Sequence, residues 1–138
     1  IVLLAVIVAA SGCLGTPNVP DNPVDNTSEE SDLPADQNTV YHTSMGFQPS
    51  TVSIEQGETV TWISNSSQAM WVGSDLHPTH ENYAGTSLRE HCQDGDQTSA
   101  AFDQCSTGDR FSFTFEKTGE WNYHNHERPG QTGKVIVQ

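Results

Sequence analysis

The sequence is poor in basic residues. Its 138 residues contain 5 Lys and Arg against 18 Asp and Glu, which gives a formal net charge of −13 at pH 7. A chain this negative repels nucleic-acid phosphates and anionic membrane surfaces, so we expect no nucleic-acid partner. The length suits one domain with room for a leader and a linker.

Long apolar runs are also lacking. Residues 1–10 form an apolar stretch of a length typical of a secretory signal rather than of a membrane span. The small residues Ala10, Ser11 and Gly12 precede Cys13, an order that resembles a lipoprotein signal, in which the cysteine is lipidated. We therefore expect a leader at residues 1–13 and an extracytoplasmic protein anchored to the cell membrane by an N-terminal lipid. The alternative is an ordinary signal peptide that is cleaved nearby.

Residues 14–38 contain four prolines and six acidic residues but no Lys or Arg. Such a segment buries too little apolar surface to offset the entropy lost on ordering. We expect a disordered, extended and acidic linker. The folded domain is then predicted at residues 39–138.

Cysteine is scarce, and its number limits the metal chemistry available. With Cys13 assigned to the leader, only Cys92 and Cys105 remain. Two cysteines in an oxidising compartment usually pair, so we predict a disulfide between them. The alternative makes one of them a thiolate metal ligand.

The domain shows short alternating segments and no sustained helical period. Residues 50–64 predict two strands around Gln56-Gly57, and residues 110–126 alternate more sharply, with Phe111, Phe113 and Phe115 on one face. Residues 39–42 and 133–137 predict the first and last strands. The pattern indicates an all-β fold, an antiparallel sandwich or barrel.

Two stretches carry a family resemblance. "FQPSTVSIEQGETVTWISNSS" (47–67) is similar to the opening of cupredoxins, small copper-binding β-sandwich proteins of the plastocyanin and azurin type. "FSFTFEKTGEWNYHNH" (111–126) and the strand after it resemble their closing hairpin. The resemblance covers residues 39–138 apart from an excursion near 84–106. It implies a Greek-key β-sandwich and a bound copper ion.

The blue-copper ligands that the resemblance implies are absent. Such a site needs two histidines, a cysteine thiolate and usually an axial methionine. The resemblance puts Asn125 at the cysteine position, Arg128 near the second histidine, Gln131 near the methionine and Met70 near the upstream histidine. An intense blue, fast electron-transfer site is therefore not expected.

Two histidine pairs stand in the same region. His77 and His80 frame "HPTH", and His124 and His126 frame "HNH" at the end of a predicted strand. Residues two apart on a strand share a face, so His124 and His126 can present two imidazoles to one ion, away from Asn125. We predict a metal site at these four histidines. Neutral imidazoles suit Cu²⁺ or Zn²⁺, and the resemblance favours copper, with zinc as the alternative.

Other residues near the histidines in sequence are weaker candidates for the metal site. Met70 is a further candidate ligand for a soft metal ion, whereas Met45 fits a core filler better. Carboxylates commonly orient metal-bound imidazoles, and three lie close in sequence to the proposed ligands: Asp75, Glu81 and Glu127. His42 is interpreted as a surface residue, and His91 as a bystander in the excursion.

These observations favour a membrane-tethered copper-binding protein with a non-blue site. It would bind or deliver copper, or transfer electrons slowly, with a redox or copper-delivery protein as partner. The alternatives are a metal-free interaction module, a small copper redox enzyme, and a site that shares its metal between subunits. An enzyme is the less favoured reading, because no Ser-His-Asp or paired-carboxylate arrangement stands out.

Overall fold

The structure, a computed structural model, describes residues 38–138. The expected leader, its Cys13 and the linker up to residue 37 lie outside the described residues, so their assignments stay predictions. Within the described part of the chain, no helix is long and apolar enough to cross a membrane.

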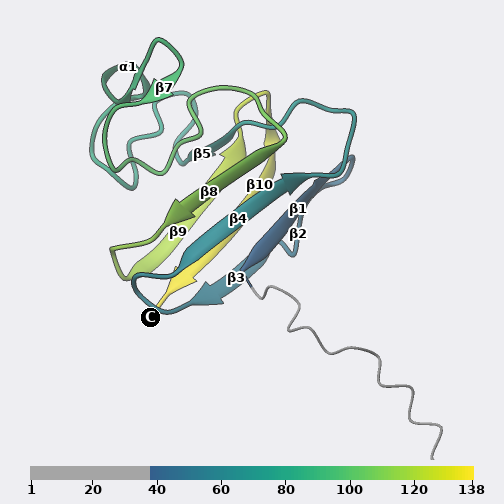
Figure 1. Cartoon of the computed structure of the whole chain (residues 1–138), viewed down its shortest axis with the longest axis horizontal. Helices are drawn as coiled ribbons and strands as arrows, with labels where there is room; N and C mark the ends of the chain where they lie inside the picture. Colours follow the sequence, from purple (N-terminus) through teal and green to yellow (C-terminus); the bar gives the residue numbers. More distant parts are fainter. Residues whose placement is uncertain (1–37) are drawn as a thin grey trace, which may run out of the picture. The chain divides into compact units, whose positions relative to one another are not determined.

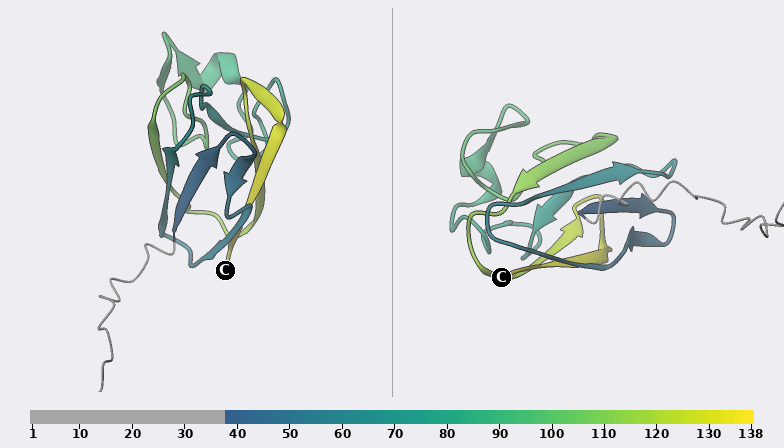
Figure 2. Two further views of the ribbon diagram at one scale, coloured as in Figure 1. Left: turned by 90° about the vertical axis from the view of Figure 1, so that its right-hand side faces the viewer. Right: turned by 60° about the horizontal axis from the view of Figure 1, so that its bottom comes forward.

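Two four-stranded sheets make up the domain (Figure 1). The first has the order β2 (Gly46–Gln48), β1 (Thr39–Thr43), β4 (Thr59–Ser64) and β8 (Arg110–Thr114). The second has the order β3 (Thr51–Ile54), β10 (Arg128–Val137), β9 (Gly119–Asn125) and β5 (Val72–Ser74). Figure 2 shows the sheets as facing layers. The predicted all-β sandwich is confirmed.

The sandwich contains two parallel strand pairs beside its antiparallel ones. β1 pairs with β4 in parallel, and β3 pairs with β10 in parallel. The reason is the turn at Gln56-Gly57, which carries the chain from β3 in one sheet to β4 in the other instead of closing a hairpin. Gly57 has a φ of +87°, a conformation that glycine adopts at little cost.

Aromatic side chains fill the space between the sheets. Trp62 is fully buried, and its ring contacts those of Phe102, Phe111 and Tyr123 at centroid distances of 5.3, 5.5 and 5.3 Å. The predicted alternation of β8 is observed, since Phe113 is buried while Ser112 and Thr114 are exposed. Burying large apolar rings is the main favourable term in the stability of such a sandwich.

The excursion packs on the same core and lies at one end of the sheets. It contains a one-turn helix, α1 (Leu88–His91), and a small ribbon of β6 (Cys92–Gln93) and β7 (Asp96–Gln97). Its Phe102 is fully buried against Trp62, and an isolated bridge joins Asp103 to Gly73 of β5. The predicted disulfide is present, with the Cα atoms of Cys92 and Cys105 5.1 Å apart.

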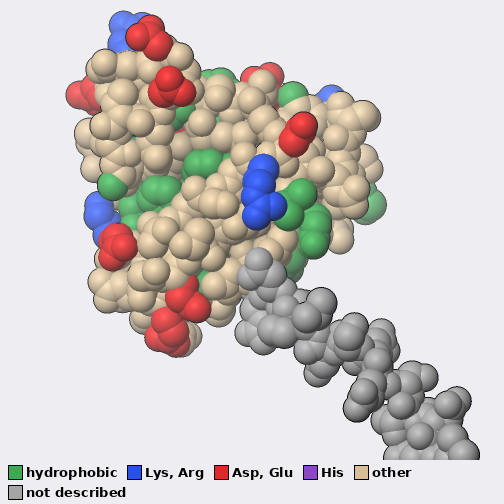
Figure 3. Space-filling view, in the orientation of Figure 1, with side chains coloured by type: hydrophobic (Ala, Val, Ile, Leu, Met, Phe, Trp, Pro, Cys, Tyr) green, Lys and Arg blue, Asp and Glu red, His purple; other side chains and the backbone are tan. Residues whose placement is uncertain are grey.

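The surface of the domain is acidic. Figure 3 shows Asp and Glu side chains scattered over one face, with few Lys or Arg among them. Three large hydrophobic side chains of the described residues are exposed, Tyr41 at 46%, Met45 at 86% and Leu76 at 71%. The prediction that Met45 fills the core is therefore wrong.

Candidate metal centre

The end of β9 sends its side chains alternately to the two sides of the sheet. Tyr123 is fully buried in the core against Trp62 and Phe47. The next residue, His124, points to the opposite side, where its Nδ1 atom lies 3.0 Å from Asp75 Oδ1. The histidine pair of this strand therefore serves a site on the outer side of the sheet, not inside the sandwich.

Gly73 makes room for a second imidazole on that outer side. It lies opposite His124 in the pairing of β5 with β9. A Cβ atom on Gly73 would fall 2.4 Å from His80 Nδ1, so the His80 ring lies directly over the strand. His80 itself has a φ of +57°, which turns the loop back over β5. A glycine within a strand is typical of such a close approach.

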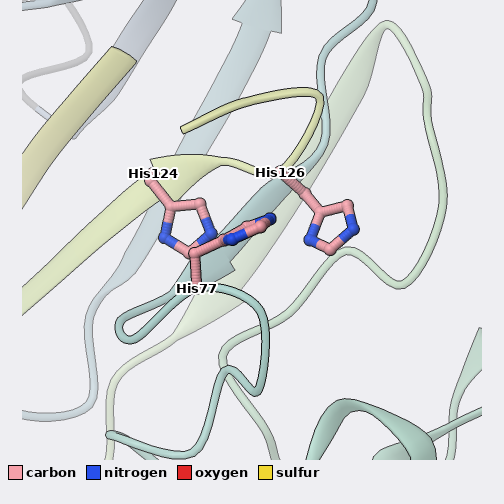
Figure 4. Close-up of side chains that lie close together, drawn as sticks. All are labelled: His77, His124 and His126. Atoms are coloured by element: carbon pink, nitrogen blue, oxygen red, sulfur yellow. The ribbon is translucent and has the colours of Figure 1, made fainter. Parts of the chain in front are cut away.

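Four imidazoles converge at this place, although the sequence alone left open whether the two histidine pairs meet. His80 Nε2 lies 3.2 Å from His124 Nε2 and 2.9 Å from His126 Nδ1. His77 completes the cluster, with ring centroids 5.3 Å from His124 and 4.9 Å from His126. Figure 4 shows the His77 ring between those of His124 and His126.

The histidine cluster contains two overlapping sets of close contacts. The ligand nitrogens of His77, His124 and His126 all lie within 4.8 Å of one another, a group that does not include His80. His80 nevertheless makes the two shortest contacts, because its Nε2 atom lies at hydrogen-bond distance from both His124 and His126. The four imidazoles therefore form one cluster.

Two carboxylates hold the buried rings. Asp75 accepts from His124 Nδ1, as the sequence analysis proposed. His80 Nδ1 makes a very short hydrogen bond to Asp103 Oδ2. With each Nδ1 atom donating to a carboxylate, the two Nε2 atoms turn their lone pairs toward the centre of the cluster.

The sequence analysis missed Asp103, which is the most highly connected polar group of the centre. It is fully buried. Its Oδ1 atom accepts from Trp71 Nε1 and from the Cys105 amide, both at 2.8 Å, and its Oδ2 atom accepts from His91 Nε2 at 3.0 Å as well as from His80. His91 is therefore no bystander, because it helps to fix the carboxylate that orients His80.

The other two carboxylates proposed from the sequence, Glu81 and Glu127, are exposed, and the structure gives their side chains no hydrogen bond to the cluster. Trp71, which the sequence analysis also missed, packs its ring against His126 at a centroid distance of 4.2 Å.

Burial shapes the protonation of the centre. Desolvation lowers the pKa of His124 below 6.5, although its hydrogen bond to Asp75 opposes the shift. Desolvation and the neighbouring His80 also lower the pKa of His126. For Asp103 burial acts to raise the pKa, but the hydrogen bonds from His80 and Trp71 outweigh it and hold the pKa below 3.8. Burial thus favours the neutral forms of His124 and His126, while Asp103 is held ionised.

Inside the sandwich, Asn125 fills the position that the resemblance assigned to a cysteine ligand. Its amide donates to Ala69 O at 2.9 Å and to Gln131 Oε1 at 3.0 Å, and its Oδ1 atom accepts from the Trp71 amide at 3.1 Å. His42 Nε2 lies 2.9 Å from the same Gln131 oxygen. The side chains of Asn125, Gln131 and His42, which are hydrogen-bonded to one another, therefore occupy this interior pocket.

The structure places His42 and Met70 in the interior of the domain. His42 is fully buried and not a surface residue, because it shares the inward face of β1 with Val40. Met70, the further candidate ligand, is 1% exposed and belongs to the hydrophobic core, which favours a packing role over metal binding.

The donor set suits a divalent transition metal. Metal–imidazole bonds of about 2.0–2.1 Å separate adjacent ligand nitrogens by roughly 2.9–3.4 Å. The two shortest contacts of His80, 2.9 and 3.2 Å, fall in that interval. Both cysteines of the described residues are joined in the disulfide, so the donor set found there is all imidazole, which suits Cu²⁺ and Zn²⁺.

Comparison with known proteins supports the expected family. Residues 34–138 match the copper-binding proteins of the plastocyanin/azurin family. The structure is similar to a novel purple cupredoxin from Nitrosopumilus maritimus, with 22% identity over 72% of this chain and 98% of that one and a TM-score of 0.51. It is also similar to an amicyanin variant in a reduced Cu(I) form at pH 4, with 21% identity over 72% of this chain and 80% of that one and a TM-score of 0.54. The chain belongs to the plastocyanin/azurin family of copper-binding proteins.

Proposed function

We propose that this protein is a membrane-tethered, extracytoplasmic copper protein that holds Cu²⁺ in a non-blue site made by His77, His80, His124 and His126. Its role is to bind and deliver copper, or to transfer electrons slowly, for a redox or copper-acceptor protein. The observation that carries the proposal is the convergence of four imidazoles beside two carboxylates on the outer side of β5 and β9.

The non-blue character follows from the donors. Intense colour in blue copper proteins needs a thiolate ligand. Cys92 and Cys105 are joined to each other, and Asn125 stands in the interior pocket. An all-imidazole site binds Cu²⁺ well but stabilises Cu⁺ less than a site with sulfur does, which favours copper binding over fast electron transfer.

Copper supplies a one-electron redox couple when it is bound, and the chain's own residues hold and orient it. Asp103 and Asp75 fix the tautomers of His80 and His124, so that their Nε2 atoms would be free to bind the metal. Trp71 covers one face of His126. The tether rests on the composition of residues 1–38 alone.

A Cu²⁺ titration followed by visible absorption and EPR tests the proposal. We expect one Cu²⁺ per chain, only weak visible bands, a wide copper hyperfine splitting, and loss of this binding in a His124→Ala/His126→Ala double variant. Far-UV circular dichroism checks that the variant is folded, and competition with Zn²⁺ decides between the two metals.

Two other outcomes would contradict the proposal. An intense thiolate-to-copper band would mean that a cysteine is a ligand. Copper binding no tighter than that of the double variant would favour the metal-free interaction module instead.

A further inference from the structure

The four imidazoles of the proposed site are held unequally. His80 and His124 are 1% and 2% exposed, and each is bonded to a carboxylate. His126 is half-buried under Trp71, and its backbone amide donates to Trp71 O at 2.8 Å. These three rings can move only if packed or hydrogen-bonded neighbours move with them.

His77 differs from the other three in each respect. Its side chain is exposed, and within residues 38–138 the structure gives it no hydrogen bond. Its ring contacts are with the other imidazoles, at centroid distances of 5.3 Å to His124, 4.9 Å to His126 and 6.4 Å to His80. It can therefore rotate away from the cluster without breaking any hydrogen bond that the structure gives its side chain.

The backbone around His77 is nonetheless firmly placed. The amides of Thr79 and His80 both donate to Leu76 O, at 2.9 and 2.8 Å, and close a turn around the residue. His80, at the end of that turn, is anchored to Asp103. A rotation of the His77 side chain thus leaves the turn and the other ligands in position.

A metal leaves a site with several ligands by successive bond breaking. The first bond to break is that of the ligand with the fewest supporting contacts, because outer contacts both orient a ligand and restrain it. Among the four imidazoles that ligand is His77. Its side of the cluster is also open to solvent, with Leu76 71% exposed beside it.

We infer that His77 is the exchangeable ligand of the copper site, and that copper passes to an acceptor protein when an incoming imidazole displaces His77. The inference rests on the proposed copper site and specifies how it works. In this first exchange one copper–nitrogen bond breaks and one forms. The bonds to the other three histidines are then replaced in turn by ligands of the acceptor, and copper stays Cu²⁺ throughout, so no electron is transferred. The acceptor approaches across an acidic rim that includes Asp75 and Glu81, which favours a partner with a positive surface.

The test compares two single-ligand variants, His77→Ala and His126→Ala, in the full chain. We expect His77→Ala to keep one Cu²⁺ per chain, with affinity lowered by at least about 10-fold, because the loss of even an outer contact to a ligand costs that much. Free imidazole should then bind the loaded variant one to one and restore the EPR spectrum of the parent protein. His126→Ala, the matched control, should lose more affinity and should not be restored.

Kinetics on the parent protein give a second measurement. The rate of copper loss to a strong chelator should rise with imidazole concentration in the parent protein. In His77→Ala, which already has the open position, imidazole should no longer accelerate the loss through displacement of that ligand. Near-UV circular dichroism of both variants checks that the exposed and the half-buried substitutions leave the fold intact.

The outcomes separate this inference from the proposed function. If the parent protein fails to bind copper, both are wrong. If it binds copper in an all-imidazole site but His77→Ala leaves affinity and spectrum unchanged, His77 is not a ligand, and both its exchange role and its place in the proposed donor set are wrong. If His77→Ala lowers the affinity but imidazole restores His126→Ala instead, only the exchange role of His77 is wrong.

Discussion

His124 and Asn125 are neighbours on β9, yet their side chains lie on opposite sides of the second sheet. His124 joins the outer cluster through Asp75 and His80, whereas Asn125 is hydrogen-bonded inside the sandwich to Ala69 and Gln131. In a strand this separation follows from the two-residue period. The asparagine does not weaken the histidine centre, because the two positions never share a pocket.

Gly73→Ala should weaken copper binding without unfolding the domain. The new Cβ atom would fall 2.4 Å from His80 Nδ1, so the ring must leave its place over β5 and lose its bond to Asp103. We expect at least about a tenfold loss of Cu²⁺ affinity by competition titration, as for the loss of an outer contact to a metal ligand.

Gly130→Ala is the matched control for this prediction. Nothing lies within 4 Å of the position that its Cβ atom would take, so copper affinity should stay at the parent value. Equal affinity of the parent protein and both alanine variants would contradict the placement of His80 over Gly73.

Asp103→Asn should lower both stability and copper affinity. The buried carboxylate accepts hydrogen bonds on both oxygens, whereas an asparagine offers one oxygen and turns an N–H group toward donors on the other side. Hydrogen bonds to a charged group contribute about 1.5–3 kcal/mol each, so we expect the free energy of unfolding to fall by roughly 2–4 kcal/mol.

Urea denaturation of the metal-free protein measures this loss for Asp103→Asn. Asp96→Asn, at an exposed position of β7, is the control and should change the free energy of unfolding by less than about 0.5 kcal/mol. A similar small change in both variants would mean that Asp103 does not stabilise the fold.

The general fold was predictable from local patterns, whereas the pairing of its strands was not. Alternation at Phe111 and Phe113 and turn residues such as Gly57 identify strands and their ends. The same patterns do not say which sheet a strand joins, because that depends on contacts between distant segments. β3 and β4, adjacent in sequence, lie in different sheets for this reason.

The candidate site was predictable where its residues form motifs. The four histidines stand in two short patterns, but the buried carboxylate and the glycine under His80 come from other segments and meet them only in the folded chain. Signals existed for some of the missed features. Asp103 follows the apolar residues Ala101 and Phe102, Gly73 interrupts a strand, and His42 lies two residues after Val40, on the same face of β1. Of these, only Asp103 and Gly73 belong to the proposed metal site, and their variants test that role.

Removing the disulfide should destabilise the domain and loosen the metal centre together. Cys92 and Cys105 are 13 residues apart, and closing a loop of this size contributes about 3 kcal/mol in the chain-entropy model. The bond also joins the segment of His91 to that of Asp103, since the Cys105 amide donates to Asp103 Oδ1.

A Cys92→Ser/Cys105→Ser double variant separates these effects. We expect its free energy of unfolding to fall by about 3 kcal/mol and its Cu²⁺ affinity to fall as well, with the weak visible bands unchanged in intensity. Loss of an intense band on this substitution would show that one sulfur is a copper ligand. An unchanged affinity would show that the bond does not position Asp103.

The metal-free domain should lose stability as the pH falls from about 7 toward 5. Desolvation lowers the pKa of His124 and of His126 below 6.5 in the folded state. The unfolded chain therefore takes up protons near pH 6.5, whereas the folded chain takes them up only at lower pH. Since the unfolded state binds more protons in this window, the free energy of unfolding is highest above pH 6.5 and decreases below it.

Urea denaturation at a series of pH values without metal measures this slope. His124→Ala/His126→Ala should flatten the dependence of the free energy of unfolding on pH, because this variant lacks the two imidazoles whose pKa values are lowered in the folded state. Asp103, whose pKa is also lowered, should add a separate loss of stability below pH 3.8 that persists in the double variant. A free energy of unfolding that rises on acidification from pH 7 to 5.5 would contradict the burial of these imidazoles, since it would require folded-state pKa values above those of the unfolded chain.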